Sequence, residues 1–161
     1  MTPVVRDASP ADRDAVDAFH DAAWAGPLAA AHGRLYDLRT LPTLVAMAPE
    51  LVGVLTYEVV GDALEVVSIA ARPARSGAGS ALLAAAVDRA RAAGLRRVWL
   101  VTTNDNVDAL RFYQRRGMRI AAVDPGAVDR SRAALKPAIP VVGAYGIPMH
   151  DELTLVLTLD G

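Results

Sequence analysis

Two glycines, at positions 77 and 79, have the type and spacing that a phosphate-binding turn requires. They follow a predicted strand and a short loop and open a predicted helix in the run Gly77-Ala78-Gly79-Ser80. Glycine lets the backbone approach an anion closely, and the unpaired N–H groups of a helix start, with the positive end of the helix dipole, point toward that anion. Arg72 and Arg75 add positive charge nearby. The alternative interpretation is a tight turn without a ligand, because a lone Gly-x-Gly pair is a weak signal.

The residues around this turn distinguish three ligands that bind to such turns. A nucleoside-triphosphate loop requires Gly-Lys-Ser or Gly-Lys-Thr, which does not follow the glycines here. A dinucleotide-binding turn requires a third glycine, where this chain has Leu82, and a repeated strand–helix–strand unit. The pyrophosphate of coenzyme A therefore remains as the ligand that fits.

A second group of chemically useful residues lies on a predicted helix from Asn106 to Arg116, which Gly117 ends. Asn106, Ala109 and Tyr113 are three and four residues apart, so they share one face of that helix. The small Ala109 leaves room between two polar side chains, and a slender ligand could pass there. The alternative role for Tyr113 is packing in the core beside its neighbour in the sequence.

Together, the two groups closely resemble the coenzyme A motifs of the GNAT superfamily of N-acetyltransferases. The matching residues are Gly77-x-Gly79 at the start of one helix and Asn106-x-x-Ala109-x-x-x-Tyr113-x-x-x-Gly117 on the next. The segments 102–106, 136–140 and 146–148 are similar to those of one bacterial subgroup of that superfamily. One position departs from the family pattern: Ala74 stands where most members carry Arg or Gln, three residues before the first glycine.

The resemblance implies that acetyl-coenzyme A is the cosubstrate and that its acetyl group passes directly to a primary amine of a small molecule or a protein. It also implies that the strand from Glu65 to Ala71 pairs with the pantetheine arm, and that an N–H group near Ile69 polarises the thioester carbonyl. The residues expected to bind the cosubstrate are Ile69, Ala71, Arg75, Ser76, Gly77, Ala78, Gly79, Ser80, Asn106, Ala109 and Tyr113.

Acetyl transfer from a thioester to an amine requires a neutral amine, a donor for the developing oxyanion and a proton for the leaving thiolate. Tyr113 matches the family's general acid, since a phenol with a pKa near ~10 stays protonated at neutral pH. Glu65 is the candidate general base: on an alternating strand it shares a face with Val67 and Ile69, and apolar surroundings raise a carboxylate's pKa. The alternative is a solvated Glu65 near the Gly61-Asp62 turn.

The acceptor pocket is expected to draw on two loop-rich segments, 24–34 and 124–152, because such loops often carry specificity. The second segment contains Arg132, Lys136, Tyr145, His150, Asp151 and Glu152 among prolines and glycines. The three histidines, His20, His32 and His150, lack metal-ligand spacing, so we expect no metal. A noncatalytic acyl-coenzyme A sensor or partner-binding module is the alternative function, since fold alone does not establish turnover.

One domain over residues 1–161 is expected to position these residues, with a GNAT-like α/β fold and a mixed, mostly antiparallel central sheet flanked by helices. Ser9-Pro10-Ala11-Asp12 predicts a helix start, and Gly61-Asp62 predicts a hairpin link. The remaining elements are predicted as strands at 3–6, 44–47, 51–60, 63–71, 97–102, 118–123 and 153–159, helices at 77–93 and 106–116, a broken helix with a loop at 24–42, and a polar segment at 124–152.

Composition limits the partners and the location. The chain has 17 basic and 18 acidic residues, so it lacks the net charge that attracts nucleic acid or an anionic membrane. It has no cysteine, no pattern of a signal peptide and no apolar run of the ~18 residues that a membrane span needs. We therefore expect a cytoplasmic protein without nucleic-acid or membrane partners. The resemblance also implies a possible homodimer.

Overall fold

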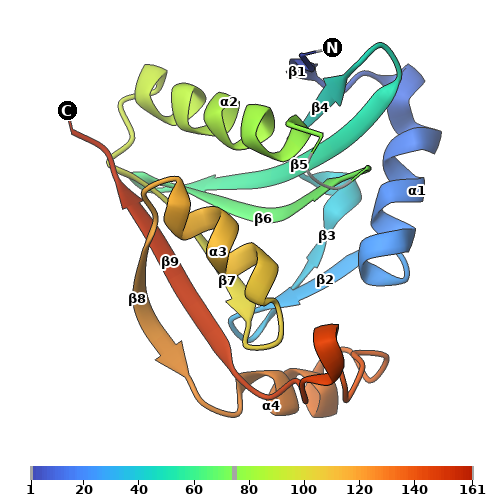
Figure 1. Ribbon diagram of the computed structural model, residues 1–161, viewed down its shortest axis with the longest axis vertical. Coiled ribbons are helices and arrows are strands. Elements are labelled where there is room, and N and C mark those ends of the chain that lie inside the picture. The colour runs from blue at the N-terminus through green and yellow to red at the C-terminus, as the bar shows by residue number, and fades with distance from the viewer. Residues whose placement is uncertain (1, 74–75, 161) are drawn as a thin grey trace. The chain divides into compact units, whose positions relative to one another are not determined.

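The computed structural model describes residues 2–73 and 76–160 (Figure 1). The chain forms two compact units, each with its own strands and helices. The first unit contains the segment up to Ala29, the segment Asp37–Val98 and the chain from Leu159 onward. The second unit contains Ala30–Tyr36 and Trp99–Thr158.

Four antiparallel strands form the sheet of the first unit, in the order β1-β4-β5-β6. Their bounds are β1 Val4–Asp7, β4 Thr43–Met47, β5 Leu51–Val60 and β6 Ala63–Ala71. Val60 pairs with Ala63 across the two-residue turn, where Gly61 has φ +60°. The predicted hairpin and the three successive antiparallel strands are therefore confirmed.

Two helices cover opposite faces of these strands. A short 3-10 turn, η1 Pro10–Asp12, leads into α1 Arg13–Trp24, which packs Val16 and Phe19 against Val45 and Val54. The second helix, α2 Ala78–Ala92, lies on the other face. A Cβ built at Gly53 would point at Leu82 and Ala78 of α2, and consecutive residues of a strand point to opposite faces, so Val54 points away from α2. The predicted apolar side of α2 is buried as expected: Leu82, Leu83, Ala86, Val87 and Ala90.

The start of α1 is held by the Asp12 carboxylate. It accepts hydrogen bonds from the Ser9 backbone N–H at 2.7 Å and from the Arg6 guanidinium at 2.6 and 3.0 Å. These contacts hold the pKa of Asp12 well below its usual range, and the hydrogen bonds from the Arg6 guanidinium have the largest effect. The Ser9-Pro10-Ala11-Asp12 pattern therefore works as predicted, with one 3-10 turn before the helix.

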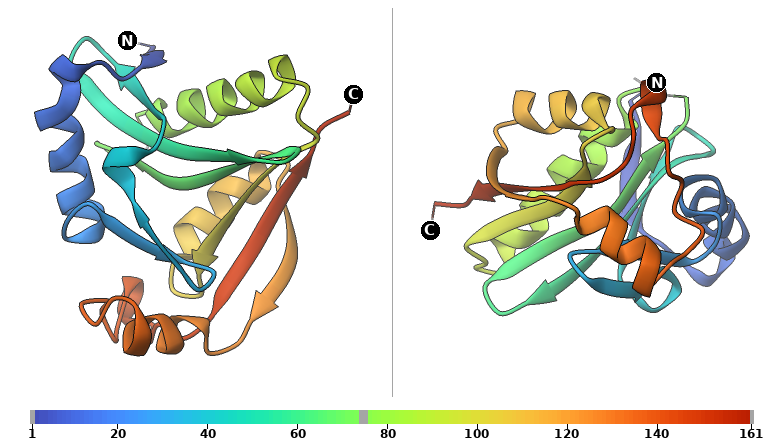
Figure 2. Two further views of the ribbon diagram at one scale, coloured as in Figure 1. Left: turned by 180° about the vertical axis from the view of Figure 1, so that it is seen from behind. Right: turned by 90° about the horizontal axis from the view of Figure 1, so that it is seen from below.

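The second unit has its own strand order, β7-β9-β8, with β8 antiparallel to β9. Figure 2 shows β8 and β9 side by side. The elements that follow Val98 are the rest of β7 Arg97–Thr103, α3 Val107–Arg115, β8 Arg119–Asp124, α4 Ala127–Ala134, the 3-10 turn η3 Ala144–Gly146 and β9 Glu152–Thr158.

Two predictions of secondary structure are wrong. Residues 24–42 do not form a broken helix after the end of α1: they form a hairpin of β2 Leu28–Ala31 and β3 Arg34–Asp37, followed by η2 Leu38–Thr40. His32 and Gly33 both have positive φ, +41° and +77°, which suits a tight hairpin turn and excludes a continuing helix. The polar segment at 124–152 contains the unpredicted helix α4.

A β-bulge interrupts the pairing of β5 with β6. Thr56 pairs with Ser68, whereas Tyr57 pairs with Val66, so Val67 is an extra residue on β6. Residues that pair across two strands point to the same face, as do residues two apart on one strand. Thr56 and Glu58 therefore share a face of β5, and so do their partners on β6, Ser68 and Glu65. The prediction that Glu65 shares a face with Ile69 is wrong.

The fold class is confirmed as α/β with mostly antiparallel strands and flanking helices. Among residues 2–73 and 76–160, no helix has the length and apolar character needed to cross a membrane.

Candidate functional site

The glycine turn begins α2 in the form that an anion site requires. Gly77 is the N-cap, with φ +87° and ψ −8°, and as a glycine it has no side chain to cap the helix. A Cβ at this position would meet nothing within 4 Å, so the backbone conformation, not crowding, requires the glycine. The Ala78 N–H donates a hydrogen bond of 3.4 Å to Ser76 Oγ. The N–H groups of a first helical turn lack intrahelical partners, and this helix start therefore fits a phosphate group.

Two residues that precede the turn in the sequence are not described by the structure. Arg75, predicted to bind the cosubstrate, and Ala74, the departure from the family pattern, lie outside the described residues. The backbone from Gly77 to Ser80 lies within the described residues.

A close approach of β5 positions the first turn of α2. A Cβ at Gly53 would lie 2.9 Å from Leu82 Cδ1, 3.3 Å from Ala78 Cβ and 3.3 Å from the Ala70 carbonyl oxygen. Only glycine allows this packing without a shift of the neighbours. Gly53 also pairs with Ala71, the last residue of β6, so the end of that strand and the start of α2 are held at the same place.

The candidate base Glu65 is buried on β6, with only 4% of its surface exposed. The alternative interpretation, a solvated glutamate, is therefore wrong, while its role as a base remains a prediction. On the same face, Ser68 Oγ accepts a hydrogen bond of 2.8 Å from Trp24 Nε1 at the end of α1. The bulge thus turns Glu65 toward the face that carries this polar contact, not toward Ile69.

The three predicted residues of α3 differ in burial along one side of the helix. Asn106 is exposed and caps the helix, its side-chain oxygen accepting from the Ala109 N–H at 3.4 Å. Ala109 is half-buried, and Tyr113 is buried, with its ring 5.3 Å from that of Phe112. Burial raises the pKa of Tyr113, so its phenol is protonated at neutral pH. Gly117, with φ +91°, follows the helix as predicted.

The second unit brings together two segments that were predicted to shape the acceptor pocket. The His32 backbone N–H lies 3.2 and 3.3 Å from the two carboxylate oxygens of Glu152. The His32 ring lies 5.1 Å from that of Trp99, and its Nε2 is 2.9 Å from the Tyr36 hydroxyl. Burial raises the pKa of Glu152, and the hydrogen bond from His32 opposes this. The tip of the β2–β3 hairpin is therefore fixed to the start of β9.

Residues after β7 hold the long segment before β9. The Asn104 side-chain oxygen accepts from the N–H groups of His150 and Asp151, at 2.9 and 3.0 Å. The Asp105 carboxylate accepts from the Ala144 N–H at 2.9 Å and from the Thr103 hydroxyl. The residues between β7 and α3 therefore order this segment, a role that the sequence alone did not predict.

The sequence analysis did not predict several residues that make these contacts. They are Tyr36, Ser68 and Trp99, which lie on three different strands, so no local spacing in the sequence connects them. Within the described ranges, no group of three or more His, Asp or Glu residues could hold a metal ion. His150 is exposed and pairs instead with Asp129, at 2.9 Å.

Comparisons with known proteins agree with the glycine turn and the tyrosine helix. Residues 13–118 match the acetyltransferase (GNAT) family. The uncharacterized protein YxbD of Bacillus subtilis is 35% identical over 91% of this chain and 93% of its own length. The uncharacterized protein YdhI of the same organism is 41% identical over 69% of each chain.

A solved structure shares the fold over the whole chain. It is the Bacillus subtilis acetyltransferase in complex with coenzyme A, with a TM-score of 0.71, 20% identity and coverage of 99% of this chain and 100% of that one. With the match over residues 13–118 and the two relatives, these findings show that the chain belongs to the GNAT acetyltransferase family.

Proposed function

We propose that the protein is an N-acetyltransferase that moves the acetyl group of acetyl-coenzyme A directly to a primary amine of a small molecule or a protein. The observation that carries the proposal is the start of α2 at Gly77, where the backbone N–H groups and the positive end of the helix dipole favour an anion. The coenzyme A complex of the structural neighbour supports the same ligand. We place this activity in the cytoplasm.

In this proposal, the backbone from Gly77 to Ser80 and the side chains of Ser76 and Arg75 bind the pyrophosphate. Ile69 and Ala71 on β6 align the pantetheine arm, and the N–H near Ile69 donates to the thioester oxygen. Asn106 and Ala109 on α3 line the arm as well. The acetyl thioester supplies the electrophilic carbonyl carbon.

The chemistry requires this chain to donate one proton and to accept another. The amine nitrogen attacks the carbonyl carbon, the C–N bond forms and the C–S bond breaks. Tyr113 protonates the departing thiolate; burial raises its pKa, so the phenol carries the proton that this step needs at neutral pH. Glu65 removes the proton of the amine, through a water molecule where direct contact is not made.

The test is a thiol-release assay with acetyl-coenzyme A against a broad panel of amines. Tyr113→Phe should keep the affinity for coenzyme A and lose about 10²–10⁴-fold in kcat, the usual size of a general-acid contribution. Tyr57→Phe, a half-buried tyrosine on β5, is the matched control and should turn over normally. Unchanged turnover in Tyr113→Phe would remove this residue from the mechanism.

The noncatalytic sensor is the competing function, and the same assay separates the two. Tight binding of coenzyme A without transfer to any amine or protein would favour the sensor. Turnover that depends on Tyr113 would favour the enzyme.

A further inference from the structure

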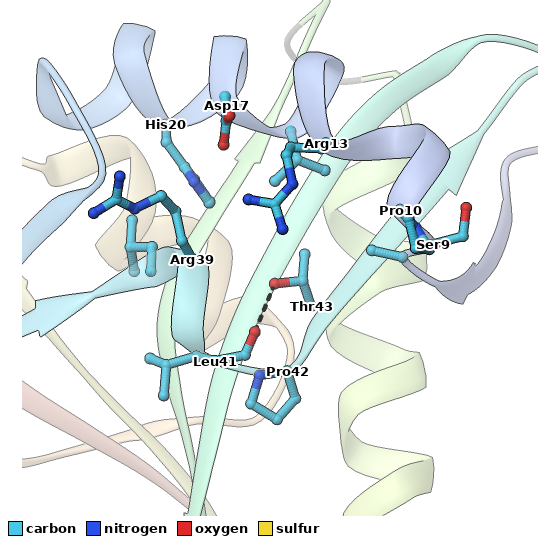
Figure 3. Close-up of a pocket in the computed structure, with 12 residues that line it drawn as sticks. Ser9, Pro10, Arg13, Asp17, His20, Arg39, Leu41, Pro42 and Thr43 are labelled. Atoms are coloured by element: carbon cyan, nitrogen blue, oxygen red, sulfur yellow. Dashed lines mark hydrogen bonds between the residues drawn. The ribbon is translucent and has the colours of Figure 1, made fainter.

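A cavity of about 300 Å³ lies in the first unit, between α1 and the segment that leads into β4 (Figure 3). Its polar lining residues are Ser9, Arg13, Asp17, His20, Arg39 and Thr43. The apolar lining comes mainly from prolines, alanine, Val16 and two leucines. The volume is at the lower end of the range for small-molecule sites, which suits a ligand with few atoms.

Both signs of charge meet in this cavity. In Figure 3, Arg13, Asp17 and His20 point from α1 toward the space above Leu41 and Thr43. Arg39 contributes from η2, where Asp37 holds its guanidinium at 3.0 and 2.9 Å. Arg13 has no ion pair among the residues that the structure describes. The cavity thus offers a carboxylate on Asp17 and an uncommitted guanidinium on Arg13.

A chain of hydroxyl groups determines the proton position on His20. Thr43 Oγ1 donates to the Leu41 carbonyl oxygen at 3.1 Å, which uses its only hydrogen. Thr56 Oγ1, 3.3 Å away, must then donate to Thr43. His20 Nε2 lies 3.4 Å from Thr56 Oγ1 and therefore donates to it. This order leaves the proton on Nε2 and a lone pair on Nδ1.

His20 Nδ1 is a buried acceptor without a donor among the described residues. The side chain is only 3% exposed, and burial lowers its pKa against the opposing effect of Asp17 and Asp21. The imidazole is therefore neutral at pH 7. An unpaired buried acceptor is unfavourable, so a hydrogen-bond donor that reaches Nδ1 from the cavity would stabilise the protein.

We propose that this cavity binds a small zwitterion, a molecule of amino-acid size that carries an ammonium group and a carboxylate. The ammonium group donates to Asp17 and to His20 Nδ1, and the carboxylate pairs with Arg13. Because Nδ1 is covered in the free protein, its hydrogen bond forms with a local rearrangement of the lining that keeps the Nε2 hydrogen bond to Thr56. This site is additional to the proposed acetyl transfer and requires neither acetyl-coenzyme A nor turnover.

The experiment follows His20 directly by NMR. The full chain, labelled with ¹⁵N-histidine, is titrated with glycine, L-serine and L-valine, and His20→Gln identifies the His20 signals. Before addition, the Nδ1 resonance should have the shift of an unprotonated, unbonded nitrogen. At least one amino acid should move that resonance upfield, while the signals of His32 and His150 stay in place.

Two analogues and four variants test the chemistry of the site. Ethanolamine, which lacks the carboxylate, and lactate, which lacks the ammonium group, should bind at least ~10-fold more weakly, because each loses a charge-assisted hydrogen bond. Asp17→Asn and Arg13→Gln should each weaken binding of the amino acid at least ~10-fold. Asp14→Asn on the same helix and Arg91→Gln on α2 are matched controls and should bind as wild type does.

Three results would overturn the proposal. The first is an Nδ1 resonance that none of the three amino acids moves in folded wild-type protein. The second is a protonated Nδ1 in the free protein, which contradicts the order of hydroxyl groups. The third is binding that survives both Asp17→Asn and Arg13→Gln. Unchanged His32 and His150 signals show that each variant is folded, so a lost response is not a folding defect.

Discussion

Substitution of Gly53 tests whether the close packing of β5 against α2 shapes the glycine turn that we propose binds the pyrophosphate of coenzyme A. In Gly53→Ala the new methyl would lie 2.9 Å from the mobile end of Leu82, but also 3.3 Å from Ala78 Cβ and from the Ala70 carbonyl oxygen. Leu82 can turn aside, whereas Ala78 and Ala70 move only with the backbone. The strain therefore falls on the first residue of α2, next to Gly77.

The expected magnitude follows from two opposing effects. Overpacking of a core position costs about 1–3 kcal/mol, and loss of chain entropy in the unfolded state offsets about 0.4–1 kcal/mol of this. We expect a net loss of about 1–2 kcal/mol in the free energy of unfolding, which at this length lowers Tm by roughly 2–8 °C. Coenzyme A should also bind more weakly, because the Ala78 N–H moves.

Calorimetry and titration with coenzyme A measure the two effects in the same preparation. Leu82→Val shortens the side chain that the new methyl meets first, so the double variant should recover part of the lost stability, with a coupling energy of about 0.5–3 kcal/mol. A Tm equal to or above that of wild type in Gly53→Ala, or strictly additive effects in the double variant, would refute the packing argument.

Three further predictions concern the α1 side of the first unit. If Glu65 is the base, Glu65→Gln should lower kcat/KM by about 10²–10⁴-fold at neutral pH. Glu58, the half-buried residue that pairs with Glu65 on β5, is the control, and Glu58→Gln should leave kcat/KM unchanged. Equal effects of the two substitutions would remove Glu65 from this role. The pKa of His20 is lowered by burial, so its neutral form stabilises the fold fully above about pH 6.5, and this contribution is lost as pH falls below that value. Thermal unfolding at a series of pH values should show a steeper acid loss in wild type than in His20→Gln, and parallel curves would contradict it. Trp24→Phe should cost about 0.5–1.5 kcal/mol in denaturant unfolding through the lost hydrogen bond to Ser68, with little further loss on adding Ser68→Ala.

Prediction from the sequence succeeded where a local signal agrees with the tertiary structure. Gly61-Asp62 forms a hairpin link because glycine supplies the positive φ, and the apolar spacing of α2 matches the face that it buries. Asn106 and Gly117 mark the ends of α3 by the same local rules. The glycine turn and the tyrosine helix, which led to the family, belong to this class.

The failures have a different physical origin. The alanines at 29–31 have high helix propensity, yet the tight turn at His32 and Gly33 pairs them into a hairpin. The contact of His32 with Glu152 joins residues 120 positions apart, which no local pattern encodes. The sequence therefore located the glycine turn at the start of α2 but not the contacts between the β2–β3 hairpin and β9.

The bulge at Val67 has a consequence for variation along β6. Before it, the residues on the α1 side are those at odd positions, such as Ala63 and Glu65; after it, they are those at even positions, such as Ser68 and Ala70. A saturation mutagenesis scan of this strand should therefore show a phase shift at residue 67, with tolerance of polar side chains alternating in opposite parity on its two sides. Deleting Val67 would remove the bulge, so that residues would alternate between the two faces without interruption along β6. To keep the pairing on one side of the deletion, every residue on the other side would have to point to the opposite face.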